Sequence, residues 1–371
     1  MPRIKPDIES FARIKVVGVG GSGGNTIDHM IRSKVRGVDF ISINTDAQDL
    51  HGSLATKKIF IGRGVTKGLG SGMNPELGRE AAEESRSEIS EAIKGADMVF
   101  VACGFGGGTG TGAAPIVASV AREQGALSVA VVTKPFQFEG MERARLADEG
   151  LRNLATSVDA MIVIPNDKLF EIIEKQTPFL KAFAMADEVL RQAVEGISDL
   201  ITMPGIINVD FADVRTIMRN AGSALMGIGS ASGDRRAVEA AEAAINSPLL
   251  DMSIEGAKGV LFSIAGGPDL TMWEINEAAR VITEPIAKDA RVIFGAMQTD
   301  RLKKGEIKVT VIATGFSHTG KSSDADNLNL FSDKAERAKP TPVRAEVSTK
   351  REAEEGQEEW DAVPAFLRRR K

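Results

Sequence analysis

The strongest constraint on the fold of this chain is a glycine-rich run at residues 103–112, in which six of the ten residues are glycine. The run follows an apolar strand expected at 98–102 and precedes a helix expected at 113–123. Glycine lets backbone N–H groups approach an anion, and the N-terminus of a helix adds partial positive charge. A flexible linker would not stand between a buried strand and a helix. The run therefore predicts a phosphate-binding loop.

The first half of the chain alternates short apolar strands with helical patterns. Further strands are expected at 14–19, 39–43, 58–62, 128–133 and 160–164, and further helices at 24–34, 79–93 and 141–155. This alternation predicts an α/β fold, in which a Rossmann-like parallel sheet is covered by helices on both faces. Ligands of such sheets bind beyond the carboxyl ends of the strands.

A continuous apolar stripe predicts a long central helix at 179–201, which Pro204 and Gly205 would end. The following pattern indicates a smaller α+β domain, with Trp273 in its core. Its helices are expected at 211–220, 235–245 and 272–282, and its strands at 223–228, 259–265, 290–296 and 307–313.

A chain of 371 residues is too long for one ordinary core, so we expect several units. Residues 317–357 are polar and should form a disordered linker, whereas large apolar residues return near the end, as in a short recognition peptide. The expected division is a flexible N-terminus at 1–10, a first domain at 11–178, a central helix at 179–203, a second domain at 204–316, the linker at 317–357 and a partner-binding peptide at 358–371.

Composition excludes several classes of protein. The net charge of −5 argues against a nucleic-acid-binding surface. Cys103 is the only cysteine, which excludes an internal disulfide and makes the cytoplasm the expected compartment. No apolar stretch is long enough for a membrane span, and the charged N-terminus does not resemble a signal peptide.

The loop after the first expected strand has two interpretations. Residues 18–23 satisfy the pattern G-x-G-x-x-G of dinucleotide-binding folds, so an NAD-dependent dehydrogenase is one alternative. Such enzymes place an acidic residue at the end of the second strand to hold a ribose hydroxyl. Here Asn44 stands at that strand end and Asp46 comes later. A second phosphate loop at 104–112 is also superfluous for NAD, so the dehydrogenase is disfavoured.

Two other glycine-rich segments are interpreted differently, one as part of the phosphate site and one as an accidental match. Residues 68–75 form a third glycine-rich turn before a helix, and three such turns in one sheet would converge on a single polyanion. Residues 315–322 match the P-loop pattern GxxxxGK[ST] but continue into a polar tail. Because a working P-loop opens an apolar helix, we interpret this second match as accidental.

Charged residues near two helix starts have more than one interpretation. Asp210 is a plausible N-cap, and Asp213 could cap reciprocally. Alternatively, the two carboxylates polarise water for attack on a phosphate. The residues alone leave both interpretations open, with capping the simpler. Arg143 stands in the first turn of its helix, where it opposes the helix dipole, so an anionic partner is expected.

Together these segments resemble the FtsZ family of tubulin-type GTPases. The resemblance rests on GGSGGN at 20–25, NTDAQ at 44–48, GGGTGTG at 106–112 and NVDFAD at 208–213, and it covers about residues 10–316. Residues 360–367 resemble the C-terminal peptide of bacterial FtsZ proteins. The family implies a GTP-bound subunit that stacks head to tail into the protofilaments of a division ring at mid-cell. Membrane-tethering and regulatory division proteins would bind 358–371.

The resemblance also implies which residues bind GTP or GDP. For the phosphates and ribose they are Gly20, Gly21, Ser22, Gly23, Gly24, Asn25, Asn44, Gly70, Ser71, Gly72, Gly104, Gly106, Gly107, Gly108, Thr109, Gly110, Thr133, Glu139 and Arg143. For the guanine they are Asn166, Phe183 and Asp187. Asp187 can accept hydrogen bonds from the N1–H and N2–H₂ groups of guanine, and Phe183 lies one helical turn earlier.

The first domain shows no evident base for hydrolysis. In the family this group comes from the next subunit, so Asn208, Asp210 and Asp213 of a neighbouring copy would complete the site. The aspartates would polarise the attacking water, and Mg²⁺ would neutralise the phosphates, with no residue assigned as a metal ligand. Hydrolysis would then require assembly. The alternative is a tubulin-like scaffold that binds GTP and assembles with little hydrolysis.

Overall fold

The first half of the chain forms the parallel sheet that the alternating pattern predicts. The computed structural model describes residues 12–171, 176–203, 205–247, 253–299 and 302–316. Six strands pair in the order β3-β2-β1-β4-β5-β6, and every pairing among them is parallel. Their bounds are β1 Ile14–Val19, β2 Val38–Asn44, β3 Lys57–Phe60, β4 Met98–Gly104, β5 Leu127–Lys134 and β6 Ala160–Pro165.

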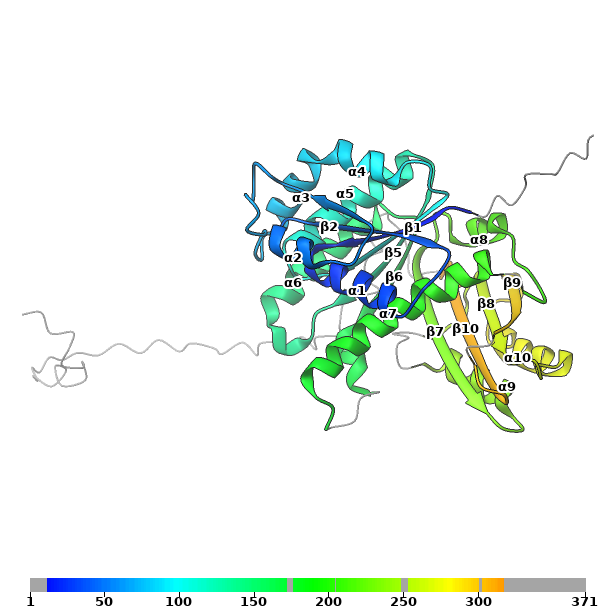
Figure 1. The fold of residues 1–371 in the computed structure, drawn as a ribbon. Coiled ribbons are helices and arrows are strands. Elements are labelled where there is room, and N and C mark those ends of the chain that lie inside the picture. Colours follow the sequence, from blue (N-terminus) through cyan, green and yellow to red (C-terminus); the bar gives the residue numbers. More distant parts are fainter. Residues whose placement is uncertain (1–11, 172–175, 204, 248–252, 300–301, 317–371) are drawn as a thin grey trace, which may run out of the picture. The chain divides into compact units, whose positions relative to one another are not determined.

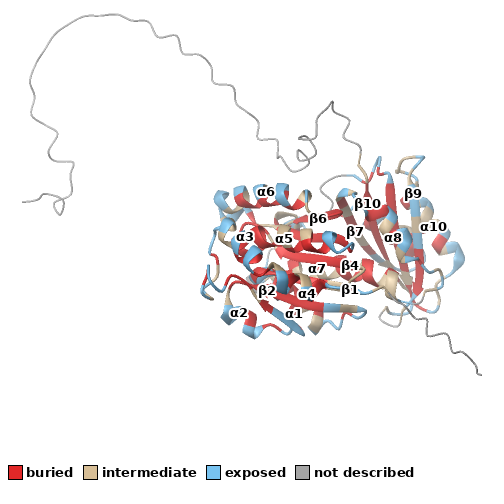
Figure 2. Ribbon diagram, turned by 90° about the horizontal axis from the view of Figure 1, so that it is seen from above, coloured by how far each residue is buried: buried red, intermediate tan, exposed pale blue. Residues whose placement is uncertain are grey.

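Helices cover both faces of these strands, as expected (Figure 1). Figure 2 shows the strands as the most continuously buried part of the molecule. The helices are α1 Gly20–Arg32, α2 Ala47–Gly52, α3 Pro75–Glu84, α4 Arg86–Ile93, α5 Thr109–Glu123 and α6 Met141–Ala155, with 3₁₀ turns η1 Gln137–Glu139 and η2 Asn166–Glu171.

Three helix predictions were wrong in their limits. Helices α1 and α5 each begin four residues earlier than expected, inside the glycine runs. Isolated glycine disfavours helix, but here close packing of the backbone overrides that preference. The helix expected at 79–93 is two helices, because Ser85 leaves helical geometry at φ −104° and ψ 17°. Helix α2 was not predicted.

The long helix predicted from the apolar stripe is α7, Phe179–Thr202. Its buried residues include Leu190, Ala193 and Ile197, and they belong to one core cluster with residues of β1, β5 and β10. Burial of this stripe, rather than local propensity, gives such a helix most of its stability. The same helix carries Phe183 and Asp187, so its packing fixes where those side chains lie.

The second half of the chain extends the same sheet. Its strands are β7 Gly222–Ser232, β8 Gly259–Gly266, β9 Arg291–Gln298 and β10 Glu306–Thr314, and its helices are α8 Phe211–Met218, α9 Arg236–Ile245 and α10 Met272–Thr283. These strands continue the order as β7-β10-β8-β9. The seam with the first half is short, since β6 pairs with β7 only from Ala160 to Ile162.

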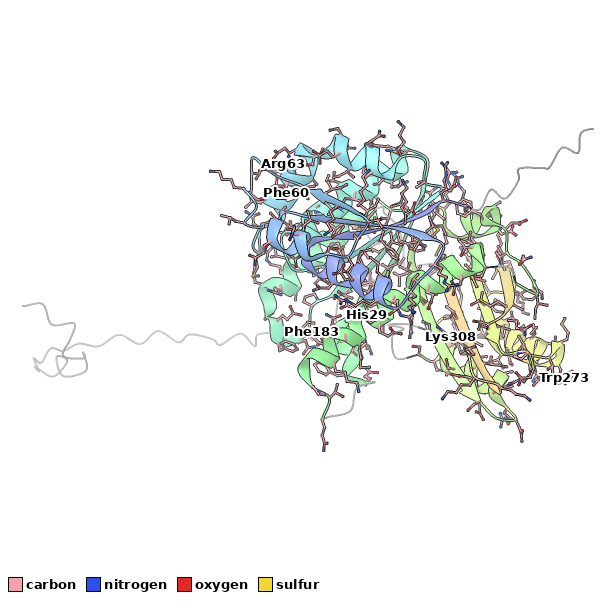
Figure 3. All side chains as sticks on the ribbon, in the orientation of Figure 1. His29, Phe60, Arg63, Phe183, Trp273 and Lys308 are labelled. Atoms are coloured by element: carbon pink, nitrogen blue, oxygen red, sulfur yellow. The ribbon has the colours of Figure 1, made fainter. Side chains whose placement is uncertain are left out.

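Some expectations for the second half are corrected or fall outside the described residues. Trp273 was expected in the core, but it is 72% exposed at the start of α10 (Figure 3). Met272 and Trp273, the first two residues after the cap Thr271, both face solvent, and the α10 core positions are Ile275, Ala278 and Ile282. The N-terminus, the linker and the peptide at 358–371 lie outside the described residues, as does most of the P-loop match. Within the part of the chain that is described, no helix is both long and apolar enough to cross a membrane.

Candidate functional site

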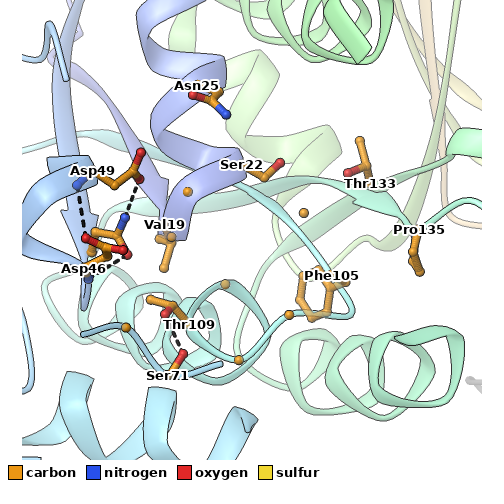
Figure 4. Close-up of a pocket in the computed structure, with 18 of the residues that line it drawn as sticks. Val19, Ser22, Asn25, Asp46, Asp49, Ser71, Phe105, Thr109, Thr133 and Pro135 are labelled. Atoms are coloured by element: carbon orange, nitrogen blue, oxygen red, sulfur yellow. Dashed lines mark hydrogen bonds between the residues drawn. The ribbon is translucent and has the colours of Figure 1, made fainter. Parts of the chain in front are cut away.

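A cavity of about 680 Å³ opens beyond the carboxyl ends of β1, β2, β4 and β5 (Figure 4). The strand order reverses beside β1, whose neighbours are β2 and β4. Such a switch point leaves a crevice between loops that diverge to opposite faces of the sheet. The segments after all four strands reach this cavity, together with one side of α7.

One end of the cavity presents two helix N-termini. Helices α1 and α5 begin at Gly20 and Thr109, both of which line it, and neither helix has a side-chain cap. The first amides of a helix have no intrahelical acceptor, and the helix dipole makes this end electropositive. A polyanion bound here would meet both sets of amides. This end is the predicted phosphate region.

Glycine is required in these loops because the backbones touch. A Cβ on Gly108 would stand 2.5 Å from the carbonyl oxygen of Gly72 and 2.5 Å from Ser71 Oγ. A Cβ on Gly20 would stand 3.0 Å from the amide nitrogen of Gly110, and Gly20 also has φ +74°. The three glycine-rich turns therefore pack directly against one another, as the sequence predicts.

A buried chain of hydroxyl groups joins two of these turns to the segment that follows β2. Thr109 Oγ1 lies 2.6 Å from Thr45 Oγ1 and 2.6 Å from Ser71 Oγ. These residues come from the segments after β2 and β3 and from the start of α5. Since hydroxyls both donate and accept, the chain can redirect a proton toward an anion at this end of the cavity.

Two carboxylates border the same end, which the sequence analysis missed. Asp46 caps α2 by accepting from the amides of Gln48 and Asp49, at 2.9 and 3.1 Å. Asp49 Oδ2 accepts from Asn44 Nδ2 at 2.6 Å. Partial burial, and next the charge of Asp46, raise the pKa of Asp49. The capping position of Asp46 before a short helix was the signal that could have placed both groups.

The other end of the cavity suits a planar polar ring. Phe183 is half-buried and meets Phe136 edge to face, with ring centroids 5.4 Å apart. Asn166 Oδ1 is buried, lines the cavity and has no hydrogen-bond partner within the described part of the chain. An orphan acceptor of this kind calls for a donor from a ligand. Asp187 supplies a second acceptor from α7, and burial raises its pKa.

Glu139 and Arg143 form an ion pair at the rim. Arg143 Nη1 donates to Glu139 Oε2 at 2.6 Å, and Glu139 Oε1 accepts from the amide of Phe136 at 2.9 Å. The anionic partner expected for Arg143 is therefore in part Glu139, four residues earlier in the same chain. The pair still lines the cavity, where the Arg143 guanidinium keeps further N–H groups for a ligand.

Most of the residues predicted to bind nucleotide line this one cavity, with three exceptions. Gly23 and Gly24 face the sheet, because a Cβ on Gly23 would meet the carbonyl oxygen of Ala102 at 2.5 Å. Gly106 instead turns the chain at φ +98° beside Arg143. Lining residues that the sequence analysis did not assign are Val19, Thr45, Asp46, Asp49, Leu69, Phe105, Pro135, Ala186 and Leu190.

The loop with the second aspartate pair does not reach the cavity. Asp210 stands at the N-cap position of α8, but its side chain makes no capping hydrogen bond. Asp210 and Asp213 are both exposed. Asn208 Oδ1 instead accepts from the amide of Gly205 at 2.6 Å and so shapes the loop. The capping interpretation therefore leaves both carboxylates unexplained.

This loop lies near the opposite end of α5 from the cavity. Arg215, two residues after Asp213 in α8, donates to the carbonyl oxygen of Gly125 at 3.0 Å. Gly125 stands just beyond the end of α5. Thr109, at the start of α5, lines the cavity. A helix of this length spans roughly 20 Å. The aspartates and the cavity of one chain therefore cannot act on the same ligand.

Among the described residues, no cluster of three or more histidine, cysteine or carboxylate side chains could hold a metal by itself. Mg²⁺ in nucleotide sites is usually held by one or two carboxylates together with the phosphates of the substrate. Asp46 and Asp49 fit that more modest requirement, since both reach the phosphate end of the cavity.

Comparison with known proteins agrees with this geometry. A profile described as the GTPase domain of the tubulin/FtsZ family matches residues 13–174, and one described as the C-terminal domain of the FtsZ family matches residues 222–317. An empty FtsZ dimer structure from M. jannaschii is 48% identical, with a TM-score of 0.78 over 82% of this chain and 88% of that one.

Two further solved structures are similar. A point mutant of M. jannaschii FtsZ is 48% identical, with a TM-score of 0.79 over 83% of this chain and 92% of that chain. CetZ2 from Haloferax volcanii, solved as a protofilament bound to GTPγS, is 23% identical, with a TM-score of 0.70 over 82% of this chain and 94% of that chain. The CetZ2 likeness concerns the fold alone.

Proposed function

The chain belongs to the tubulin/FtsZ family of filament-forming GTPases, and from this premise we propose that it hydrolyses GTP at the contact between successive subunits of a head-to-tail filament. The filament would form the division ring at mid-cell, in the cytoplasm. The cavity would bind GTP or GDP, with the phosphates at the N-termini of α1 and α5 and the guanine between Phe183, Asn166 and Asp187.

The observation that carries the proposal is the separation of two half-sites on one chain. The cavity has the groups that hold a nucleotide, and the exposed Asp210 and Asp213 lie near the far end of α5. A second copy stacked in the same orientation can bring its aspartates to the open side of the cavity. Such a contact is heterologous and does not close on itself, so it builds a filament.

Exposed apolar side chains border both half-sites and support this contact. Leu69, at the cavity rim, is 87% exposed. Ile206 is 60% exposed beside the aspartate loop, where its amide donates to Ala296 of β9. Phe294, on the same strand, is also partly exposed. Apolar groups of this kind are typical of surfaces that are covered in an assembly.

In the proposed reaction the chain positions the phosphates and the attacking water. Backbone amides of the glycine loops hold the γ-phosphate, and Asp210 and Asp213 of the next subunit orient and polarise the water. Asp46 and Asp49 would hold Mg²⁺ with the phosphates, and the ion would supply charge neutralisation when bound.

The dependence of GTPase activity on protein concentration tests the proposal. Phosphate release per subunit should rise steeply as the concentration passes the threshold for assembly. Specific activity that stays flat from nanomolar to micromolar protein would contradict a shared site. Asp213→Ala should bind GTP normally and lose hydrolysis. If turnover instead survives in the double variant Asp210→Ala/Asp213→Ala, the group that polarises the water lies within one chain.

A second candidate function is a scaffold that binds GTP and assembles with little hydrolysis. It is favoured by the fact that no aspartate of the 208–213 loop lines the cavity of its own chain. Light scattering and phosphate release measured on the same sample distinguish the two. Stable assembly with no phosphate release would favour the scaffold.

The C-terminal peptide at 358–371 is proposed to bind membrane-tethering and regulatory division proteins. Phe366 and Leu367 would be the apolar anchors, and the basic end at 368–371 would favour acidic partners or lipids. Removal of 358–371 should abolish adaptor binding while leaving GTP hydrolysis intact. Unchanged adaptor binding in the shortened chain would overturn this assignment.

A further inference from the structure

One buried hydroxyl links the phosphate end of the cavity to its base end. Thr26 is fully buried in α1, and its Oγ1 lies 2.7 Å from Asp187 Oδ1 on α7. The same Oγ1 lies 3.0 Å from the carbonyl oxygen of Ser22, which is in the first turn of α1. Both Ser22 and Asp187 line the cavity, whereas Thr26 does not. Thr26 can therefore affect a bound ligand only through these neighbours.

The hydroxyl has one proton for two acceptors. A carboxylate attracts it more strongly than a carbonyl, because hydrogen bonds to ionised groups are stronger. With Asp187 ionised, Thr26 therefore donates to Oδ1. If Asp187 takes up a proton, the carboxyl can donate to Thr26, and Thr26 can donate to Ser22. The direction of this short relay reports the protonation of Asp187.

The surroundings of Asp187 explain why it needs such a donor. Burial raises the pKa of its carboxyl, and the hydrogen bond from Thr26 and then the charge of His29 act in the opposite sense. His29, however, is paired with Glu188 at 3.0 Å, and Glu188 also binds Arg191. Asp187 Oδ2 has no hydrogen-bond partner among the described residues. Thr26 thus supplies the only hydrogen bond that the structure gives this carboxylate from the described chain.

We propose that Thr26 is a positioning residue for guanine selectivity: its hydroxyl holds Oδ1 of Asp187 so that the carboxylate presents itself to the paired N–H donors of the base. This inference rests on the proposed function, because it concerns the same nucleotide site. A carboxylate held in one rotamer can accept from two adjacent donors, whereas a freely rotating one loses that two-point contact. A purine without the second donor depends less on this orientation.

The test compares GDP with inosine diphosphate, which lacks the 2-amino group. The affinity for each diphosphate is measured by calorimetry on the unchanged full chain and on the variants Thr26→Val, Thr26→Ser and Thr283→Val. Diphosphates are used because they have no γ-phosphate to be hydrolysed during the measurement. Valine keeps the shape of threonine and removes the hydroxyl, whereas serine keeps the hydroxyl. Thr283 is a matched control in α10, where its hydroxyl donates to the carbonyl oxygen of Ala279 at 2.8 Å.

Thr26→Val should weaken GDP binding about tenfold, as expected for one hydrogen bond to a charged group. Binding of inosine diphosphate should weaken much less, so the preference for GDP shrinks. Its GDP affinity should also begin to fall at a higher pH on acidification than that of the parent chain, because Asp187 protonates more readily. Thr26→Ser and Thr283→Val should keep the parent preference and the parent pH profile.

Several results would overturn the role of Thr26. One is an unchanged or stronger preference for GDP in Thr26→Val. Another is a loss of GDP affinity in Thr26→Ser equal to that in Thr26→Val, which would assign the effect to packing and not to the hydroxyl. If Thr26→Val does not fold, Thr26→Ala removes the hydroxyl without adding bulk and gives the same comparison. A parent chain that does not prefer GDP to ADP would instead contradict the proposed function itself, and the role of Thr26 with it.

Discussion

At the scale of the residue, the glycines of the phosphate loops serve two different purposes. Gly107 lines the cavity and has no atom within 4 Å of where its Cβ would stand. Gly112, by contrast, is inside α5, and its Cβ would stand 1.9 Å from the carbonyl oxygen of Pro75. The first position serves access to a ligand, and the second serves the contact between α3 and α5.

Replacing each of these glycines by alanine should therefore change stability to very different extents. Glycine to alanine inside a helix normally stabilises by about 1 kcal/mol. Gly112→Ala should instead destabilise by about 3 kcal/mol or more, because backbone atoms of α3 must move. Gly107→Ala should stay within about 0.5 kcal/mol of the parent. Urea unfolding of the nucleotide-free proteins measures both values, and a stable Gly112→Ala protein would show that the helix contact is looser than described.

At the scale of the element, a network of charged side chains joins α1 to α7. Glu188 on α7 accepts from His29 of α1 and from Arg191, whose guanidinium also binds Glu195. Burial of Glu188 opposes its ionisation, but the hydrogen bonds from Arg191, His29 and Gln192 outweigh burial and lower its pKa to about 2. The helix that positions Phe183 and Asp187 is thereby tied to the helix that begins at the phosphate end.

This network predicts a defined acid sensitivity. The unfolded chain protonates Glu188 near pH 4.5, whereas the folded chain keeps it ionised down to about pH 2. Unfolding therefore takes up a proton in this window, and stability must fall as the pH falls through it. Glu188→Gln should be less stable at neutral pH and should lose less stability between pH 4.5 and pH 2.

The matched control is Glu91→Gln, which removes an exposed carboxylate paired with Lys94 on the surface of α4. Thermal unfolding followed by circular dichroism at several pH values compares the three proteins. Parallel curves for the parent and Glu188→Gln would mean that the network contributes nothing to acid sensitivity.

The elements also show how far sequence patterns can be taken. Strands such as β1 and β4 were predicted closely, because apolar β-branched runs between polar segments have few other interpretations. The starts of α1 and α5 were predicted four residues late, since glycine gives no helical signal. Only contacts from distant segments, such as Pro75 against Gly112, make those glycines helical.

The candidate site was predictable to a similar degree. The glycine loops could be assigned from their own motifs, whereas Asp187 was assigned only through the resemblance to the FtsZ family; residues of both line the cavity. The carboxylates of Asp46 and Asp49 were missed, since their place beside the cavity depends on how α2 folds over β2. Thr26 was missed for the same reason, because its partner is 161 residues away in sequence.

At the scale of the whole molecule, the sheet and α5 place the two half-sites far apart. The cavity lies at the carboxyl ends of the parallel strands, and the 205–210 segment pairs with β9 through Ile207 and Ala296. No local movement of the aspartate loop would bring it to the cavity of the same chain. Activity must therefore belong to a pair of molecules if the aspartates are catalytic.

A mixing experiment tests this arrangement directly. Asp213→Ala keeps an intact cavity and lacks one catalytic carboxylate, whereas Asp187→Ala keeps the aspartate loop and binds GTP poorly. Each variant alone should hydrolyse GTP at a small fraction of the parent rate. In an equimolar mixture, a GTP-loaded Asp213→Ala subunit can meet the intact loop of an Asp187→Ala subunit, so activity should return. By random pairing it should reach at most about a quarter of the parent rate, since only one of the four ordered pairings has both intact halves.

A mixture of Asp213→Ala with the double variant Asp187→Ala/Asp213→Ala has no intact loop and should stay inactive. Recovery in that control would mean that Asp213 is not required for hydrolysis. No recovery in the first mixture, at concentrations where the parent chain is active, would mean that the site is complete within one chain.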